Sequence, residues 1–213
     1  VMNTPGQNSN AVAELALAMM IGNGGAAYLS LKLGEGNVNS AKKGIGNAVT
    51  MVTAVSIVLA AVFLLFINPI LTLFGATDTL RPYALDYGWI IGIGLPFMMI
   101  SGAINSMIRA DGSPKYAMFS MVIGAVLNVI LDAVFIFPLQ MGVQGAAIAT
   151  VIGQVASFVV SVAYLPRFKT VRLNKSAFCL DTKACGNIVV FGLSSFITQF
   201  AITIVMALTN NLL

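Results

Sequence analysis

The stretch YAMFSMVIGAVLNVILDAVFIFPL, residues 116–139, decides the fold. It is apolar and long enough to cross a bilayer as one helix, for which about 20 residues suffice. Asn128 and Asp132 lie within it four positions apart, so both side chains project from one face of the helix. A carboxylate inside a membrane span is costly, usually faces a protein interior or a wet cavity, and often handles ions or protons. The alternative interpretation is a polar pair that joins two helices by hydrogen bonding.

The composition of the whole chain also indicates a membrane protein. Its 213 residues are 58% hydrophobic and 8% charged, with a mean hydropathy of +0.93, whereas about 25% of the residues of a soluble domain are charged. The absence of histidine from the sequence excludes Ser-His-Asp catalysis and histidine-ligated metal sites. We expect no enzyme and no cofactor. The net charge of +4 is interpreted as topology and contact with anionic lipid, not as a sign of a nucleic-acid partner, because the cations lie in connecting loops. The two cysteines, Cys179 and Cys185, are interpreted as structural.

Hydropathy predicts six membrane spans, at residues 11–33, 47–67, 84–108, 116–138, 143–165 and 187–213. The lysines and arginines of the five connections number 3, 1, 2, 0 and 5 in chain order. The positive-inside rule then makes three loops cytoplasmic, at 33–46, 109–115 and 166–186. The first span would run from outside to inside, so a cytoplasmic N-terminus would need one more span upstream. We expect a multi-pass protein of the cell (inner or plasma) membrane.

The same topology sets the depth of the polar residues. Asp132 is expected about 24 Å above Tyr116, in the outer half of a hydrocarbon core about 30 Å thick. Tyr87 lies in the first turns of the third span, and Thr150 lies about two turns into the fifth, at a similar depth. Asn128 lies one turn deeper than Asp132. The four side chains would converge if the helices form a bundle.

Three segments resemble the multidrug and toxic compound extrusion (MATE) family, in its bacterial and archaeal branches. They are GLPFMMISGAINSMIRADGSPKYAMFSMVIGAVLNVILDAVFIFPLQMGVQGAAIATVIGQ at 94–154, GNGGAAYLSLKLGEGNVNSAKKGIGNA at 22–48 and GLSSFITQ at 192–199. The resemblance implies an all-α helix bundle of twelve spans in two six-helix lobes, monomeric at full length. This chain would contain the first lobe without its first helix at 1–166, a cytoplasmic basic linker at 167–186, and the first helix of the second lobe at 187–213.

The resemblance also implies a secondary antiporter that exports cationic amphipathic drugs or toxins in exchange for H⁺ or Na⁺. In similar prokaryotic members, a site in the first lobe uses an Asn and an Asp of helix five, a Tyr of helix four and a Thr of helix six. These correspond to Asn128, Asp132, Tyr87 and Thr150, with Tyr83 as an alternative tyrosine. Asp132 and Asn128 would be the metal ligands if the coupling ion is Na⁺. A further acid on the family's first helix has no counterpart in this chain.

The substrate cavity is less defined by the sequence. Some members of the family use a Glu on the first helix of the second lobe, but residues 187–213 contain no acid. Gln199 and Asn210 are the polar candidates on that helix. Met98 and Met121 are candidates for an adaptable apolar wall, because methionine fits irregular surfaces. Simple apolar filling is the alternative for both methionines.

The chemistry expected of Asp132 does not depend on the family. Desolvation favours a protonated acid, whereas Na⁺ or an organic cation favours the ionised form, so one carboxylate exchanges one cation for another. A related flippase for lipid-linked saccharides is a second hypothesis, disfavoured because no Lys or Arg is predicted mid-span. An inactive fragment of a transporter is a third. A membrane enzyme is disfavoured because the spans offer a single mid-span acid, Asp132, and no histidine.

Overall fold

The computed structural model describes residues 7–73 and 80–212, and the described residues form helices and no strand. The long helices are α1 (Gln7–Gly34), α2 (Val38–Leu65), α4 (Arg81–Ala110), α5 (Pro114–Ile136), α6 (Gly142–Val162) and α7 (Thr182–Leu212). A short α3 (Ile67–Leu73) follows α2, and two 3₁₀ turns, η1 (Leu165–Arg167) and η2 (Lys175–Phe178), lie between α6 and α7. The predicted all-α class is confirmed.

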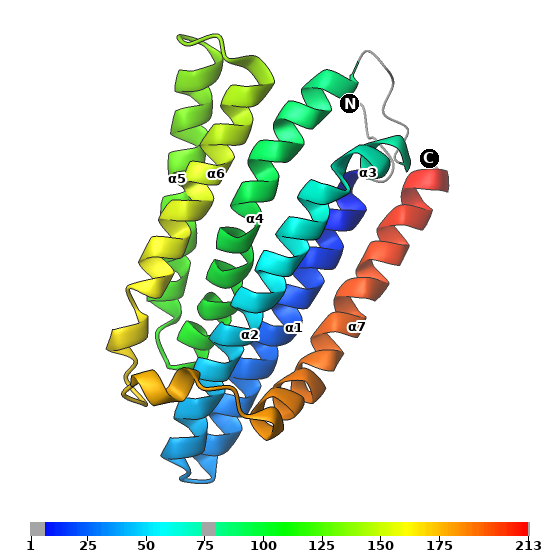
Figure 1. The fold of residues 1–213 in the computed structure, drawn as a ribbon. Coiled ribbons are helices and arrows are strands. Elements are labelled where there is room, and N and C mark those ends of the chain that lie inside the picture. The colour runs from blue at the N-terminus through cyan, green and yellow to red at the C-terminus, as the bar shows by residue number, and fades with distance from the viewer. Residues whose placement is uncertain (1–6, 74–79, 213) are drawn as a thin grey trace.

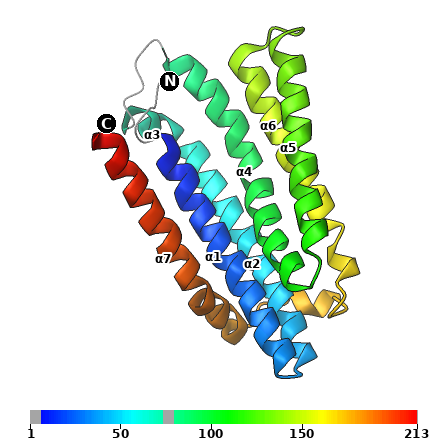
Figure 2. The same cartoon turned by 180° about the vertical axis from the view of Figure 1, so that it is seen from behind.

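The long helices pack side by side as one bundle (Figure 1). The α5–α6 pair and α7 lie on opposite sides of the group formed by α1, α2 and α4 (Figure 2). Successive helices alternate in direction, so the α1–α2 turn, the α4–α5 turn and the segment after α6 share one end (Figure 1). These are the connections with the most cations, as the positive-inside argument requires of loops on one side.

Five of the described helices are long and apolar enough to cross a membrane, at Val38–Leu65, Arg81–Ala110, Pro114–Ile136, Gly142–Arg167 and Thr182–Ile202. The predicted span at 11–33 corresponds to α1, which is not among these five. Its glycines and Asn23 make the described part of α1 less apolar than its neighbours. Large apolar side chains cover the outside of the bundle, as expected where lipid is the solvent; Leu65, Val129 and Val190 are more than half exposed.

The predicted loop at 33–46 is wrong in extent, because α2 begins at Val38 and carries Lys42 and Lys43 in its first turns. Asn37 caps this helix: its Oδ1 accepts a hydrogen bond from the backbone N–H of Ser40 at 3.0 Å. Such a cap satisfies one of the free donors at a helix start and so lets the helix extend beyond the apolar segment.

Small residues allow α5 and α6 to approach closely. A Cβ atom built on Gly153 of α6 would lie 2.6 Å from the carbonyl oxygen of Gly124 on α5, and one built on Gly124 would lie 2.7 Å from the carbonyl oxygen of Gly153. Real Cβ atoms do not come so near, so a larger residue at either position would separate the helices. In lipid, where burial gives little drive between helices, this close packing is a main source of association.

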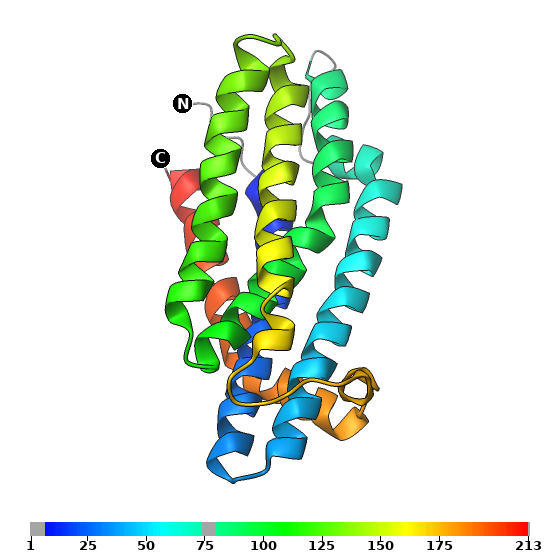
Figure 3. The same ribbon diagram turned by 90° about the vertical axis from the view of Figure 1, so that its left-hand side faces the viewer.

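The segment between α6 and α7 crosses the end of the bundle (Figure 3) and is fixed there by a buried acid. Asp111, at the end of α4 and only 3% exposed, accepts hydrogen bonds from the Tyr164 hydroxyl at 2.7 Å and the Lys169 N–H at 2.8 Å. Its other oxygen accepts from the backbone N–H of Thr170 at 2.9 Å and from its hydroxyl at 2.5 Å. Asp111, which belongs to the predicted loop at 109–115, therefore holds the segment that follows α6.

A buried amide fixes the other end of the same segment. Asn47 on α2 is fully buried, and its Oδ1 accepts a hydrogen bond from the backbone N–H of Asp181 at 2.7 Å. The Asn47 side-chain N–H donates to the carbonyl oxygens of Lys43 at 2.7 Å and Cys179 at 3.3 Å. The Cys185 thiol lies 3.3 Å from the same Asn47 oxygen. Both cysteines are free thiols, in agreement with a structural interpretation.

Candidate ion and substrate site

The structure brings two of the predicted site residues into direct contact. The side-chain N–H of Asn128 on α5 donates a hydrogen bond to the Thr150 hydroxyl on α6 at 3.3 Å, and that hydroxyl donates to the carbonyl of Ala146 at 2.9 Å. The close approach at Gly124 and Gly153 makes this contact possible, because it brings the two backbones together one turn away. The side-chain oxygen of Asn128 remains a possible ligand or acceptor at the α5–α6 interface.

Asp132 lies one helical turn beyond Asn128, on the same face of α5. The side chain is half-buried, and its Oδ1 is buried without a hydrogen-bond partner among the described residues. A buried carboxylate oxygen without a donor is costly as an anion, and it is relieved by a proton or a bound cation. The geometry therefore suits a group that changes its cation.

Tyr87 lies near Asp132 without bonding to it. The Tyr87 hydroxyl and the Asp132 carboxylate are close enough to interact electrostatically, while 40% of the Tyr87 side chain stays exposed. Tyr83, the alternative tyrosine, is 60% exposed and borders a second pocket together with Asp86 and Gln144. In that pocket the side-chain N–H of Gln144 donates a hydrogen bond to the Asp86 carboxylate at 2.9 Å. Of the two tyrosines, Tyr87 is therefore the one placed beside the acid.

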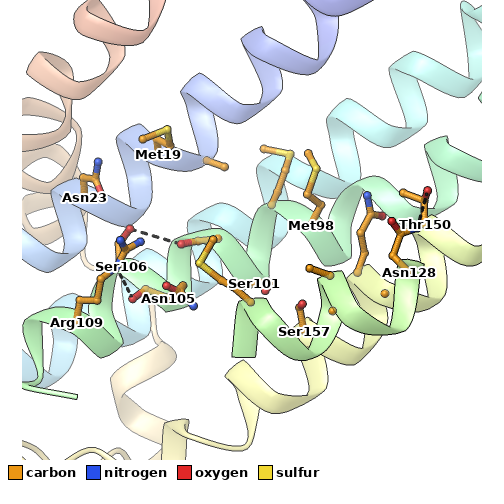
Figure 4. A pocket seen from close by; sticks show the side chains of 18 residues that line it. Met19, Asn23, Met98, Ser101, Asn105, Ser106, Arg109, Asn128, Thr150 and Ser157 are labelled. Carbon is orange, nitrogen blue, oxygen red and sulfur yellow. Dashed lines mark hydrogen bonds between the residues drawn. The ribbon is translucent and has the colours of Figure 1, made fainter. Parts of the chain in front are cut away.

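A cavity of about 730 Å³ opens between α1, α4, α5 and α6. Figure 4 shows its two polar ends, with Asn128 and Thr150 at one end, Asn23, Ser106 and Arg109 at the other, and Met98 between them. The lining residues are Ala18, Met19, Asn23, Met98, Met99, Ser101, Gly102, Asn105, Ser106, Arg109, Met121, Gly124, Ala125, Asn128, Thr150, Gly153, Gln154 and Ser157. A cavity of this size suits a drug-sized ligand.

The predicted substrate residues divide between this cavity and other places. Met98 and Met121 line it, as the hypothesis of an adaptable apolar wall requires. Gln199 on α7 does not line it, and the side chain of Asn210 lies outside the part of the chain described. On the same side of the bundle, Asn23 of α1 donates a hydrogen bond to the Ser195 hydroxyl of α7 at 3.2 Å. That contact ties α7 to the helix that forms one wall of the cavity.

Sequence reasoning missed the polar stripe of α4. Ser101, Asn105 and Arg109 recur every four residues and line the cavity toward the α4–α5 turn, and Ser106 lies beside them. We call this end of the cavity the inner end. This spacing puts the three on one helix face and was readable from the sequence. Arg109 was instead assigned to a cytoplasmic turn, because a cation at a helix end usually marks topology.

Two further acceptors in the cavity wall have no donor among the described residues, namely Asn105 Oδ1 and Gln154 Oε1. Asn105 is only 2% exposed, and its amide N–H groups donate to the Ala117 carbonyl and the Ser120 hydroxyl, both at 2.8 Å. These bonds join α4 to the start of α5 and fix the side chain. A buried acceptor without a donor is unusual in a packed interior. Both amides therefore mark a region where buried oxygens lack hydrogen-bond donors among the described residues.

The comparisons with known proteins agree with the architecture. The family model for MatE matches residues 10–134, more than half of the chain. The chain belongs to the MatE family. The resemblance inferred from the sequence is thereby confirmed.

Individual relatives of this MatE chain are distant but cover most of it. It is 29% identical over 170 residues to a protein of Shewanella oneidensis named "FAD transporter", covering 78% of this chain and 37% of the relative. It is 28% identical over 160 residues to the "Probable multidrug resistance protein YoeA" of Bacillus subtilis, covering 73% of this chain and 34% of the relative. The chain thus spans little more than a third of the length of these curated relatives.

Among solved structures, the chain resembles one described as "Inward-facing conformation of a multidrug resistance MATE family transporter of the MOP superfamily". The TM-score is 0.79 at 26% identity, covering 92% of this chain and 45% of that one. The fold predicted from the sequence, a MATE-like bundle represented in part, is confirmed by this similarity.

Proposed function

We propose that this chain is the ion-coupling part of a secondary antiporter that exports amphipathic organic compounds in exchange for H⁺ or Na⁺. The observation that carries the proposal is the buried Asp132 oxygen without a partner among the described residues, one turn from the Asn128–Thr150 contact and close to Tyr87. The other three groups in this cluster are neutral, so the occupancy of one carboxylate decides the local charge. The coupling ion is the only cofactor that the mechanism needs.

The cluster can exchange a proton for a metal ion without a change of residues. A proton would sit on Asp132 and remove the cost of the unpaired oxygen. Na⁺ would instead be held by oxygens of Asp132 and Asn128, with the hydroxyls of Thr150 and Tyr87 as further neutral ligands. In either case a bound cation stabilises the arrangement of α4, α5 and α6 that it contacts. Ligands that bind one conformation more tightly shift the population toward it, as alternating access requires.

The exported compound would occupy the cavity that reaches from Asn128 to Arg109. Cationic amphipathic drugs or toxins are the class predicted from the sequence, and the name of the Bacillus relative supports multidrug export. The lining of the cavity includes no acid among the described residues, and Asp132 is not one of the lining residues, so a cationic cargo would depend on Met98, Met99 and Met121 for contact.

A second cargo class is favoured by the Shewanella relative, which is named for FAD, a dinucleotide rather than an organic cation. A lipid-linked saccharide, the cargo of the related flippases, belongs to the same anionic class. Either cargo would meet the positive charge of Arg109 at the inner end of the cavity. The protein would act as a monomer in the cell membrane, with the end that holds Asp111 and Asn47 in the cytoplasm.

The test uses the complete gene product in cells that lack their own multidrug exporters. Efflux of ethidium is followed under an imposed pH gradient and, separately, under a Na⁺ gradient. Asp132→Asn should reduce gradient-driven efflux to the level of cells without the protein. Asp86→Asn is the matched control, because Asp86 is an exposed acid outside the cluster. Undiminished gradient-dependent efflux by Asp132→Asn would remove Asp132 from the mechanism.

A further inference from the structure

The inner end of the cavity carries a single charge. Of the 18 lining residues, Arg109 alone is charged, and it lies three positions from Ser106 on the same face of α4. Its Nε donates a weak hydrogen bond to the carbonyl of Asn105 in its own helix, at 3.4 Å. A guanidinium has five N–H donors in a planar fork, so most of its capacity remains available to a molecule in the cavity.

Arg109 has no counter-ion among the described side chains. The ion pairs found there are Lys32–Glu35 and Lys43–Asp181. Asp111 is the nearest acid along the sequence, but Tyr164, Lys169 and Thr170 occupy both of its oxygens. The positive charge of Arg109 is therefore uncompensated beside a cavity whose middle is apolar. Arg109 is an exposed residue that lines the cavity, so its attraction for an anion acts over a short range and weakens as salt is added.

We propose that the inner end of this cavity is an anion-binding subsite, where Arg109 and the neighbouring Ser106 hydroxyl bind phosphate or carboxylate oxygens of an amphipathic cargo. The inference rests on the proposed transport function and specifies the cargo. Arginine suits this task because its fork matches the two oxygens of a carboxylate or phosphate. Asn23 and Ser101 add polar groups around the same end.

The length of the cavity defines the shape of this cargo. Met98 and Arg109 are 11 positions apart on α4, which corresponds to about 16 Å along the helix. The anionic group would lie beside Arg109 and an apolar or aromatic body would lie against Met98 and Met99. This order, charge at the inner end and apolar surface beyond, fits a soluble organophosphate such as FAD and also a membrane lipid phosphate.

The experiment reconstitutes the complete gene product in liposomes and measures three probes under the same ion gradient. Radiolabelled FAD represents a soluble organophosphate, a fluorescent short-chain polyprenyl phosphate represents a lipid phosphate, and ethidium represents a cationic drug. Each probe is measured with wild type, Arg109→Gln, Arg109→Lys, Arg172→Gln and Asp132→Asn. Arg172 is the matched control, because it is an exposed arginine of the same end that does not line the cavity. Size-exclusion profiles and melting temperatures establish that each variant is folded.

We expect wild type to move FAD or the polyprenyl phosphate, and whichever is moved identifies the source of the anion. Arg109→Gln should raise the half-saturating concentration of that probe about tenfold or more, as loss of a charge-assisted hydrogen bond does. The half-saturating concentration for Arg109→Lys should lie between those of wild type and Arg109→Gln, and that for Arg172→Gln should equal the wild-type value. Asp132→Asn should abolish gradient-driven movement of every probe, which separates failure of coupling from failure of the subsite.

Three results would overturn the inference. The first is a wild type that moves ethidium alone, with neither phosphate probe transported or able to compete; the antiporter proposal would then survive without the anion subsite. The second is an equal effect of Arg109→Gln and Arg172→Gln on the phosphate probe, which would make Arg109 a topological cation only. The third is a wild type that moves none of the probes under an H⁺ gradient or under a Na⁺ gradient. That result would overturn the proposed function together with the subsite.

Discussion

Asn128 on α5 donates a side-chain hydrogen bond to the hydroxyl of Thr150 on α6 at 3.3 Å, and this hydroxyl donates in turn to the carbonyl of Ala146. The contact joins two helices at the position where the candidate cation site begins. Thr150→Val keeps the shape of the side chain but leaves the Asn128 N–H without its acceptor. We expect a loss of about 1–3 kcal/mol in stability, and coupling-ion affinity about threefold to tenfold weaker.

The measurements for Thr150→Val are the melting temperature in detergent and the dependence of transport on Na⁺ or H⁺ concentration. Thr150→Ser is the control, because it retains the hydroxyl and should behave like wild type. A valine variant with unchanged stability and unchanged ion dependence would show that the contact is incidental.

Gly153 is predicted to accept no side chain at all. Gly153→Ala would place a methyl group 2.6 Å from the Gly124 carbonyl oxygen, which must push α5 away from α6. Overpacking of this kind typically costs about 1–3 kcal/mol. Gly186→Ala on α7 is the control, because nothing lies within 4 Å of the position that its methyl group would take, and alanine favours a helix by about 1 kcal/mol. Melting temperatures should therefore move in opposite directions, and a fall for both or for neither would contradict the packing described.

Asp111→Asn should weaken the inner end of the bundle. The NH2 group that replaces one carboxylate oxygen would face either the backbone N–H of Lys169, at the Oδ2 position, or that of Thr170, at the Oδ1 position, and both of these are donors. Loss of hydrogen bonds to a charged acceptor suggests a cost of about 2–4 kcal/mol. The readouts are the melting temperature and the rate of tryptic cleavage after Lys169. Asp86→Asn, the same change at an exposed acid, should leave both near wild type, and equal effects of the two variants would refute the role of Asp111.

The N-terminus of α7 should respond to acid. The backbone N–H groups of Ala184 and Lys183 lower the pKa of Asp181 below its usual value of 3.8, and Lys43 acts in the same direction. A carboxyl whose pKa is lowered by folding adds stability above its unfolded pKa, and this contribution is lost as the pH falls through the folded value. The melting temperature of wild type should therefore exceed that of Asp181→Asn above the unfolded-state pKa, and the two melting temperatures should converge as the pH falls through the lowered folded-state pKa. A difference that is constant across this range would exclude ionisation of Asp181 as its cause.

The sequence predicted the helices well because each is a long apolar run that has no stable alternative in a bilayer. The Asn128–Asp132 pair was also readable, since a four-residue spacing sets one face of a helix without any knowledge of tertiary contacts. The alternating loop charges predicted Thr150 at the depth of Asp132, with Asn128 one turn deeper, whereas the hydrogen bond of Thr150 is made with Asn128 and depends on the actual packing of α5 on α6.

The residues that escaped prediction are those whose environment is made by distant segments. The role of Asp111 could not be predicted because its partners, Tyr164 and Thr170, lie more than fifty positions further along the chain. Arg109 read as a topology marker because only the packing of α1 and α5 around α4 encloses the face that it shares with Asn105. Local spacing fixes which face a side chain occupies, whereas the neighbour on that face depends on the whole bundle.

Hydrogen bonds from two helices fix the segment between α6 and α7 across one end of the bundle. Asp111 and Asn47 anchor it from two different helices, and Asn105 stitches α4 to α5 in the same region. If the α5–α6 pair tilts, it would rotate about this hydrogen-bonded end. The cavity between α4 and the α5–α6 pair would then widen most around Asn128 and least around Arg109. A molecule bound beside Arg109 would keep that end in place, while its other end would lie where the cavity opens and closes.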